Sequence, residues 1–397
     1  MRYIFFSTMV CLSFNAWATH LEFGKPITVT GTEQGVFHHL ESSGRRSLAV
    51  NKGTVAIAWE DNSSGTPQIY VAFKASESKS FTTPITVSEA GPAYEPVIAR
   101  IGEQFVVGWE AGDRLWVRFV SAGRSGPVLK LSQHPARHLT LAASLNTKQV
   151  IAVWSEKTTR YYQLKLAGLN LKQMQLSIQA RGLVDNSPDK TDQLYPTVTV
   201  TKRGTVVAWE DRRQGATRIM TAFAPTGQAL GTYQILNDFR QSRIQRFGHG
   251  TGAMRVVLAG KADGQVMATW LDKRNFEGGY DVYTAQSKDG GNSFGPDELA
   301  QDPLGENTPQ WHPTVAVSDR GLVIVAWDDT RDGSPDIWYS LRRNKSWTDD
   351  EVWPGSSGEG SQTLPVLVFD QQYIHIAWLD RQGQASAIRY IRAKAID

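Results

Sequence analysis

The sequence is poor in cysteine, in long apolar runs and in net charge. Its only cysteine among 397 residues is Cys11, so no cysteine pair exists for a disulfide framework. Beyond the N-terminal segment, no apolar run approaches the roughly 20 residues that cross a bilayer. The formal net charge is only +3, which gives no electrostatic reason to expect nucleic-acid binding. These absences exclude a disulfide-stabilised scaffold and predict neither nucleic acid nor membrane insertion among the partners.

The first 18 residues have the pattern of a cleavable secretory signal. Met1 and Arg2 precede an apolar stretch over residues 3–14, and Ala16-Trp17-Ala18 supplies the small residues of a cleavage site. Cys11 lies inside this segment and follows Val10, whereas a lipoprotein signal requires a small residue there. We therefore expect cleavage after Ala18, a mature chain without cysteine or lipid, and a periplasmic or secreted location.

Seven tryptophans recur along the chain, each at the end of a short apolar run and most of them followed by acidic residues. They are Trp59, Trp109, Trp154, Trp209, Trp270, Trp327 and Trp378. The successive intervals are 50, 45, 55, 61, 57 and 51 residues, the range of one four-stranded propeller blade. Alternating β-branched and aromatic residues around each tryptophan predict short antiparallel strands. The sequence therefore predicts an all-β fold, a seven-bladed β-propeller that forms a single domain over residues 19–397.

The two ends of the mature chain are predicted to complete one blade together. The seventh repeat ends after its third strand, while residues 25–29 resemble the outer strand of the first repeat, residues 84–87. The N-terminal strand would join the last blade, close the ring and remove an unpaired sheet edge. The repeat tryptophans are expected to pack between neighbouring blades, because a large ring buries much apolar area there.

One segment, residues 287–294, is more specific than the repeat itself. It reads Ser-Lys-Asp-Gly-Gly-Asn-Ser-Phe and resembles the Asp-box of sialidases and other BNR-repeat propellers, matching at Ser287, Asp289 and Gly291 and departing at Ser293 and Phe294. In that family the motif is a structural turn on the face away from the active site. The resemblance does not carry a sialidase active site over, because sialidases use six blades and the first repeat has Arg45-Arg46 where they show Arg-Ile-Pro.

Propeller topology predicts one loop-rich face, built from the loops that lead into each first strand and those that join second to third strands. Carboxylates, guanidiniums, imidazoles and aromatic rings gather in these loops, as a polar, hydroxyl-rich ligand would require. The candidate ligand-binding residues are His38, His39, Arg46, Glu95, Tyr195, Asp211, Arg246, His249, Asp272, Arg274, Trp311, His312, Asp329 and Arg331.

Two groups of these candidates also have a structural interpretation. The arginine of each recurring Asp-x-Arg could form an ion pair across its own hairpin, with an aspartate at the start of the third strand. Arg274 would pair with Asp281, and Arg331 with Asp336. The stretch 237–252 departs from the repeat and carries Arg246 and His249 among several basic residues. Its arginines could hold an anionic sugar, such as a uronic acid, sialic acid or sulfated sugar, or form a solvated basic loop.

Three functions follow from these residues. The first is recognition of a carbohydrate or other polyanionic ligand on the loop-rich face. The second is catalysis there. Paired carboxylates among Glu60, Glu95, Glu110, Glu210 and Asp272 would perform glycoside hydrolysis, and Tyr195, His249 or His312 beside an arginine would act as in the seven-bladed polysaccharide lyases, which this architecture also resembles. The third is a periplasmic protein-interaction scaffold, for which an exposed apolar patch is expected.

No cofactor is required by any of these functions. The one segment with enough oxygen ligands for calcium is 328–336, which contains four aspartates but does not have the spacing of an established calcium loop.

Overall fold

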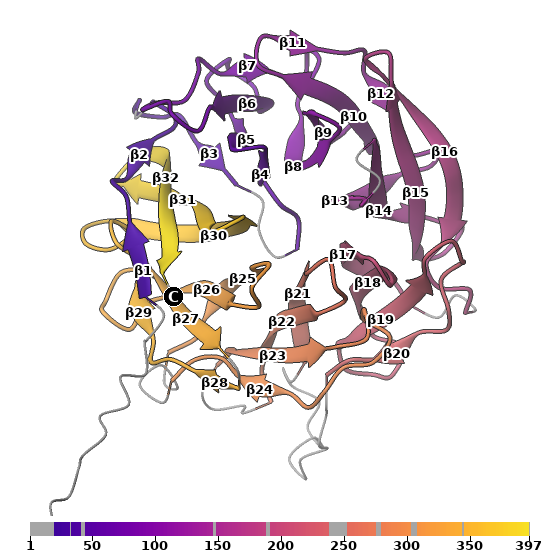
Figure 1. The fold of residues 1–397 in the computed structure, drawn as a ribbon. Coiled ribbons are helices and arrows are strands. Elements are labelled where there is room, and N and C mark those ends of the chain that lie inside the picture. The colour runs from indigo at the N-terminus through magenta and orange to yellow at the C-terminus, as the bar shows by residue number, and fades with distance from the viewer. Residues whose placement is uncertain are drawn as a thin grey trace, which may run out of the picture.

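The computed structural model shows seven antiparallel sheets arranged as blades around a central axis (Figure 1). It describes residues 20–31, 33–40, 44–145, 148–187, 191–237, 252–274, 279–302, 308–343 and 345–396. All regular elements in these ranges are strands, and no helix is present there that could cross a membrane. The predicted all-β, seven-bladed propeller is confirmed.

Each blade begins with its innermost strand and runs outward. Blade 1 contains β3 (His38–His39) and β4 (Leu48–Asn51), then β5 (Thr54–Asp61), β6 (Gln68–Lys74) and β7 (Ile85–Thr86). Blade 2 contains β8 (Tyr94–Ile101), β9 (Gln104–Ala111), β10 (Arg114–Ser121), β11 (Arg124–Ser125) and β12 (Leu129–Lys130). Blade 3 contains β13 (Ala136–Ala143), β14 (Gln149–Lys157), β15 (Tyr162–Lys172) and β16 (Gln175–Leu183).

The remaining blades follow the same plan. Blade 4 contains β17 (Gln193–Thr201), β18 (Gly204–Asp211), β19 (Arg218–Pro225) and β20 (Gln234–Ile235). Blade 5 contains β21 (Ala253–Gly260), β22 (Val266–Asp272), β23 (Asp281–Ser287) and β24 (Glu298–Leu299). Blade 6 contains β25 (Trp311–Val317), β26 (Val323–Asp329), β27 (Asp336–Arg343), β28 (Ser346–Trp347) and β29 (Glu351–Val352). Blade 7 contains β30 (Ser361–Asp370), β31 (Tyr373–Gln382) and β32 (Ala385–Ile396).

The N-terminal segment completes blade 7, as predicted. Strands β1 (His20–Phe23) and β2 (Ile27–Thr28) both pair antiparallel with β32, the last strand of the chain. Ile27 lies opposite Tyr390 and His20 opposite Ile396, so the first and last described strands are adjacent at this edge of the ring (Figure 1). The pairing removes the edge that β32 would otherwise expose.

The seven repeat tryptophans lie between blades, as predicted, and each is at most 2% exposed. Trp109, for example, packs with Ile69 and Val71 of the preceding blade. Five of the indole N–H groups donate to a carboxylate two residues further along the chain. The acceptors are Asp61, Glu156, Asp211, Asp272 and Asp329. The acidic residues after the tryptophans therefore satisfy a buried donor within each blade.

A buried histidine in blade 7 is expected to make stability depend on pH. His375 Nδ1 lies 2.7 Å from the hydroxyl of Tyr390. Burial, with repulsion from Arg392 and Lys74, lowers the pKa of His375 to about 3. Because an unfolded histidine titrates near 6.5, the unfolded state binds more protons below about pH 6.5, and stability is lost as the pH falls from there.

The measurement is urea denaturation of wild-type protein and His375→Gln at two pH values. Between about pH 7 and pH 5, we expect the wild-type free energy of unfolding to fall by about 2 kcal/mol more than that of the variant. Burial raises the pKa of Asp350 to about 6, which acts in the opposite direction in both proteins and cancels in the comparison. Equal pH slopes would show that His375 titrates normally in the folded state.

Candidate functional site

A bulge recurs at the start of the inner strand in six blades. At each bulge the strand pairing shifts register, and one residue adopts the left-handed backbone conformation. We call these the bulge residues: Glu95, His138, Tyr195, Arg255, His312 and Leu364. A non-glycine residue in this conformation costs roughly 1–2 kcal/mol, and such strain is concentrated at functional sites. The bulges therefore identify the loop-rich face, near the axis, as the candidate site.

Carboxylates of the preceding blade hold four of the bulges in place. In these four cases the residue directly after a repeat tryptophan accepts the backbone N–H of the bulge residue in the next blade. The acceptor and donor pairs are Glu60 with Glu95 (3.2 Å), Glu110 with His138 (2.7 Å), Glu210 with Arg255 (2.8 Å) and Asp328 with Leu364 (3.1 Å). Burial raises the pKa of Glu210 despite the opposing N–H bond from Arg255. These carboxylates connect adjacent blades and orient the bulge side chains.

Two bulge residues, His138 and Arg255, converge on a third, Tyr195. The imidazole of His138 stacks on the Tyr195 ring with centroids 4.0 Å apart, and the Tyr195 backbone N–H donates to His138 Nδ1 at 3.4 Å. The Arg255 guanidinium lies 4.0 Å from the centroid of the same ring. Arg45 lies 5.9 Å from it on a segment of blade 1. A phenol, an imidazole and two guanidiniums thus lie together, and we call Tyr195, His138, Arg255 and Arg45 the Tyr195 cluster.

Arg45 extends this cluster to a pair of carboxylates. Its guanidinium lies 2.7 Å from Glu95 Oε2 and 3.6 Å from Glu110 Oε1. Arg45 itself is only 5% exposed, whereas Glu95 is partly exposed, so one buried cation is shared by two acids at the edge of the site.

The segment 44–46 of blade 1 reaches across the ring to the opposite blades. A Cβ on Gly44 would lie 2.6 Å from the Val256 carbonyl oxygen and 2.8 Å from the Thr197 Cβ. Thr140 donates from its hydroxyl to the Gly44 carbonyl at 3.0 Å. Only glycine, which has φ +90 here, fits this contact with blades 3, 4 and 5. The crossing places Arg45 beside Tyr195, although the two residues lie on blades far apart in the sequence.

A second, separate pair lies at the bulge of blade 6. His312 Nδ1 lies 2.8 Å from Asp328 Oδ1, and the His312 side chain is 37% exposed. Burial raises the pKa of Asp328, although the contact with His312 opposes the change. A buried carboxylate that orients a half-exposed imidazole is an arrangement suited to acid–base chemistry.

Three large aromatic side chains on the loop-rich face are exposed to solvent. Phe37, Tyr94 and Trp311 are 47%, 42% and 42% exposed. Tyr94 directly precedes Glu95, and Trp311 directly precedes His312 and tilts against Tyr280 at 5.4 Å. Exposed rings beside polar groups provide flat apolar surface for a ligand.

The predicted histidines of blade 1 lie apart from the Tyr195 cluster. His38 is buried and its Nδ1 lies 2.9 Å from the Ser386 hydroxyl. Burial lowers the pKa of His38, although nearby Asp61 opposes the change. His39 stacks with Phe37, with centroids 6.5 Å apart. Arg246 and His249 lie outside the described residues.

The Asp-x-Arg candidates form ion pairs within their own blades. Arg274 bonds Asp272 and Asp297, both at 2.6 Å, and Arg331 bonds Asp329 and Asp350 at 2.6 and 2.9 Å. Arg213 bonds Asp211 of its own blade, but its second partner, Asp185, follows β16 at the outer edge of blade 3. The sequence predicted pairing with Asp281 and Asp336, but the observed second partner lies at the outermost strand.

The segment 287–294, predicted to be an Asp-box-like turn, forms a tight turn after β23, on the face opposite the loop-rich face. Asp289 accepts the Ser293 N–H at 2.9 Å and the Ser293 hydroxyl at 2.6 Å, while Ser287 accepts the Gly291 N–H at 2.9 Å. Burial alone would raise the pKa of Asp289, but these bonds outweigh it and lower the pKa to about 2. Phe294 packs against the hydrophobic core between blades 4 and 5.

The segment considered for calcium directs its carboxylates to protein donors. Asp328 contacts His312 and the Leu364 N–H, and Asp329 accepts from Trp327 and Arg331. Within the described ranges, no group of three or more histidine, cysteine, aspartate or glutamate side chains is placed to hold a metal ion.

The sequence identified Glu95, Tyr195 and His312 as candidates, and the structure places all three at bulges. It named Glu110 only as a possible hydrolytic carboxylate, did not single out Arg255, and left Arg45 and His138 out of the candidate ligand-binding residues. A signal exists for four bulge residues, because Glu95, Tyr195, His312 and Leu364 each precede a proline. His138 and Arg255 precede Leu139 and Val256, so only the register of the strands reveals them.

No protein-family model and no curated protein matches this chain. Among solved structures it is similar to the polysaccharide lyase Uly1, with TM-score 0.60, 9% identity, and 95% of this chain and 100% of that chain covered. It is also similar to an α-L-arabinanase of Penicillium chrysogenum complexed with arabinobiose, with TM-score 0.53, 11% identity, and 94% of this chain and 98% of that chain covered. A sialidase of Trypanosoma rangeli has TM-score 0.51 and 8% identity, with 94% of this chain and 59% of that chain covered. These neighbours are carbohydrate-active propellers, and at such identities the likeness shows the fold alone.

Proposed function

We propose that this protein binds an acidic polysaccharide on its loop-rich face and cleaves it by β-elimination at the Tyr195 cluster. The observation that carries the proposal is the convergence of His138, Tyr195 and Arg255 at three successive bulges. The similarity to a polysaccharide lyase supports the same ligand class at the level of the fold.

The reaction needs two functions that this cluster contains. A guanidinium neutralises the uronate carboxylate, and Arg255 and Arg45 both face the Tyr195 ring. A base then removes the proton beside that carboxylate, the bond from the neighbouring carbon to the glycosidic oxygen breaks, and the departing oxygen takes up a proton. Tyr195 and His138 are the acid–base groups in contact with each other at this position. The product carries a new carbon–carbon double bond.

The test is an ultraviolet assay for that double bond on a panel of uronate polysaccharides, with a reducing-end assay in parallel. We expect the two signals to rise together on at least one polymer. Arg255→Gln is expected to lose both signals, whereas Arg124→Gln, on the outer strand β11, is expected to keep them. Binding of acidic glycans without either signal would leave recognition as the function and contradict the elimination.

Glycoside hydrolysis is the second candidate, because Glu95 and Glu110 share the Arg45 guanidinium. Two carboxylates close together can serve as acid and as base or nucleophile. Hydrolysis produces reducing ends without ultraviolet absorbance. The parallel assays therefore distinguish the two reactions on the same substrates.

The exposed aromatic rings provide a separate test of sugar binding. Trp311→Ala is expected to raise KM by roughly tenfold or less and leave kcat unchanged, because aromatic contacts contribute about 0.5–1.5 kcal/mol. The side chain is half-exposed, so the free energy of unfolding should change little. Leu183→Ala removes a similarly exposed side chain from outer strand β16 and is the matched control. A KM equal to that of wild type would exclude Trp311 from the binding surface.

Export belongs to the same proposal. The N-terminal signal pattern lies outside the described residues, and β1 begins at His20, two residues after the expected cleavage site. Mass spectrometry of the protein recovered from the periplasm or medium should show a chain that begins at Thr19.

A further inference from the structure

The segment 44–46 separates two compartments along the axis of the ring. Gly44 packs on Thr197 and on the backbone of Val256, and the Arg46 carbonyl accepts the Ile98 N–H at 2.8 Å. Arg45 points toward the Tyr195 cluster on the loop-rich side. Arg46 lines a cavity further along the axis. The two successive arginines of this crossing therefore place one cation in each compartment.

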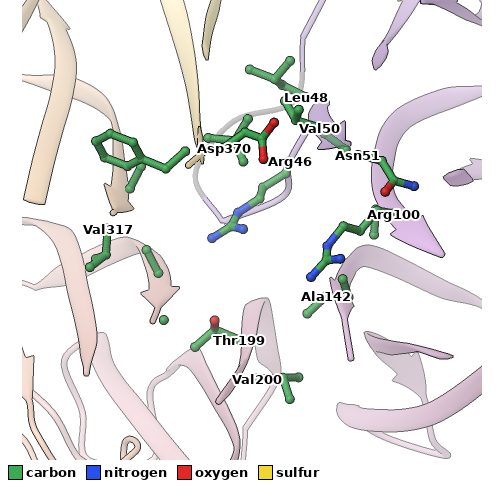
Figure 2. A pocket seen from close by; sticks show the side chains of 18 of the residues that line it. Arg46, Leu48, Val50, Asn51, Arg100, Ala142, Thr199, Val200, Val317 and Asp370 are labelled. Carbon is green, nitrogen blue, oxygen red and sulfur yellow. The ribbon is translucent and has the colours of Figure 1, made fainter. Parts of the chain in front are cut away.

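The cavity has a volume of about 510 Å³ and lies between the inner strands of all seven blades. Its walls include the turns that connect first to second strands, such as those at Asn51, Gly102 and Gly260, so it belongs to the face opposite the Tyr195 cluster. The side chain of Arg46, from the segment that precedes β4, and that of Arg100, from β8, point into it, with Thr199 and Val317 on other walls (Figure 2). Its volume is within the range of small-ligand sites, roughly 300–1,000 Å³.

The cations of the cavity exceed its anions. The charged lining residues are Arg46, Arg100, Lys52 and Lys261 against Asp319 and Asp370, a formal balance of 4 − 2 = +2. Asp370 accepts the Gly53 N–H at 3.2 Å. Within the described ranges, neither Arg46 nor Arg100 forms an ion pair, and the one hydrogen bond shown for either guanidinium joins Arg46 to the Leu258 carbonyl at 2.8 Å.

Arg46 is a partly buried cation that has no carboxylate partner among the described residues. Burial lowers the pKa of Arg46, and no acidic neighbour offsets it. A buried charge is unfavourable unless it is paired, so an anion in the cavity would compensate this guanidinium. Arg100, to the right of Arg46 in Figure 2, provides a second guanidinium with further donors.

We propose that this cavity binds an oxyanion group, a carboxylate, sulfate or phosphate, between the guanidiniums of Arg46 and Arg100. It is a second ligand site, separated from the Tyr195 cluster by segment 44–46. Arginine is suited to this ligand, because its planar fork matches the oxygens of these groups. The proposal does not depend on the polysaccharide reaction.

The experiment is equilibrium dialysis of the mature chain against radiolabelled inorganic sulfate at constant ionic strength. We expect saturable binding of one sulfate per wild-type chain. Arg100→Gln is expected to raise the dissociation constant by roughly tenfold or more, since a charge-assisted hydrogen bond contributes about 1.5–3 kcal/mol. Arg100 is exposed and is expected to tolerate the change without unfolding. Arg46→Lys keeps the charge but not the fork, and it should also weaken binding.

Two control variants locate the bound sulfate. Arg124→Gln, in the same blade as Arg100, and Arg255→Gln, in the Tyr195 cluster, should both bind as tightly as wild type. Competition with unlabelled phosphate and with glucuronate distinguishes a free inorganic ion from the acidic group of a sugar. The proposal is overturned if the wild-type chain binds none of the three anions, if Arg100→Gln binds unchanged, or if Arg255→Gln loses the binding instead.

Discussion

Tyr195→Phe is expected to lower kcat for polysaccharide cleavage by roughly a thousandfold, within the range for removal of a general acid or base. The phenylalanine ring keeps the stacking with His138 and the contact with Arg255, so only the hydroxyl is lost. If the hydroxyl transfers the proton, kcat falls while KM changes little. The measurement is the initial rate of ultraviolet absorbance on the most active substrate of the panel.

The change must be separated from damage to the fold. Tyr195 adopts the left-handed conformation with φ 48, and phenylalanine meets the same backbone strain. Circular dichroism and the unfolding midpoint of Tyr195→Phe should therefore match wild type. The matched control is Tyr94→Phe, since Tyr94 is exposed one residue before the bulge in blade 2 and is not in the Tyr195 cluster. A Tyr195→Phe enzyme with an unchanged kcat would assign the proton transfer to another group, with His138 the first to test.

Arg331→Met is expected to destabilise the fold by about 3–5 kcal/mol, the largest stability effect that we predict. The guanidinium lies between Asp329 and Asp350, and both carboxylate side chains are at most 1% exposed. Burial would lower the pKa of Arg331, but its bonds to these carboxylates outweigh burial and raise it. Methionine fills similar space over Trp338 and leaves two buried carboxylates without their cation.

The pH dependence of this loss distinguishes an electrostatic cause from a packing cause. Burial already raises the pKa of Asp350 to about 6 even with Arg331 present, and removal of the guanidinium raises it further. A raised carboxyl pKa favours the protonated folded state, so the deficit of Arg331→Met should shrink as the pH falls toward about 6, where Asp350 of the wild type also becomes protonated. Urea denaturation at several pH values measures it. Lys52→Met removes an exposed ion pair with Glu103 and should change little. A deficit independent of pH would indicate lost packing instead.

The fold was predictable because its signal is repeated. Each blade buries a large side chain against its neighbour. The tryptophan that does so recurs from Trp59 and Trp109 onward, at intervals of 45 to 61 residues. The N-terminal closure was predictable for a similar reason, because a seventh repeat without an outer strand leaves an edge that another segment must pair. In contrast, the partners of Arg274 and Arg331 were wrongly predicted from proximity in sequence, because the outermost strand returns to the loop from a distance of about twenty residues, as at Asp350 (350 − 331 = 19).

The sequence by itself determined the class of fold, the number of blades, the face on which polar loops gather, and several residues of that face, including Glu95, Tyr195 and His312. These features depend on the alternation of apolar and polar residues along each strand and on a sequence repeat that is present in every blade. Only the tertiary structure decided which side chains meet. Arg45 reaches Tyr195 because segment 44–46 crosses the ring, and His138 and Arg255 reach it because adjacent inner strands bulge at the same level. Contacts across a closed ring join residues of different blades, and no local sequence pattern specifies them.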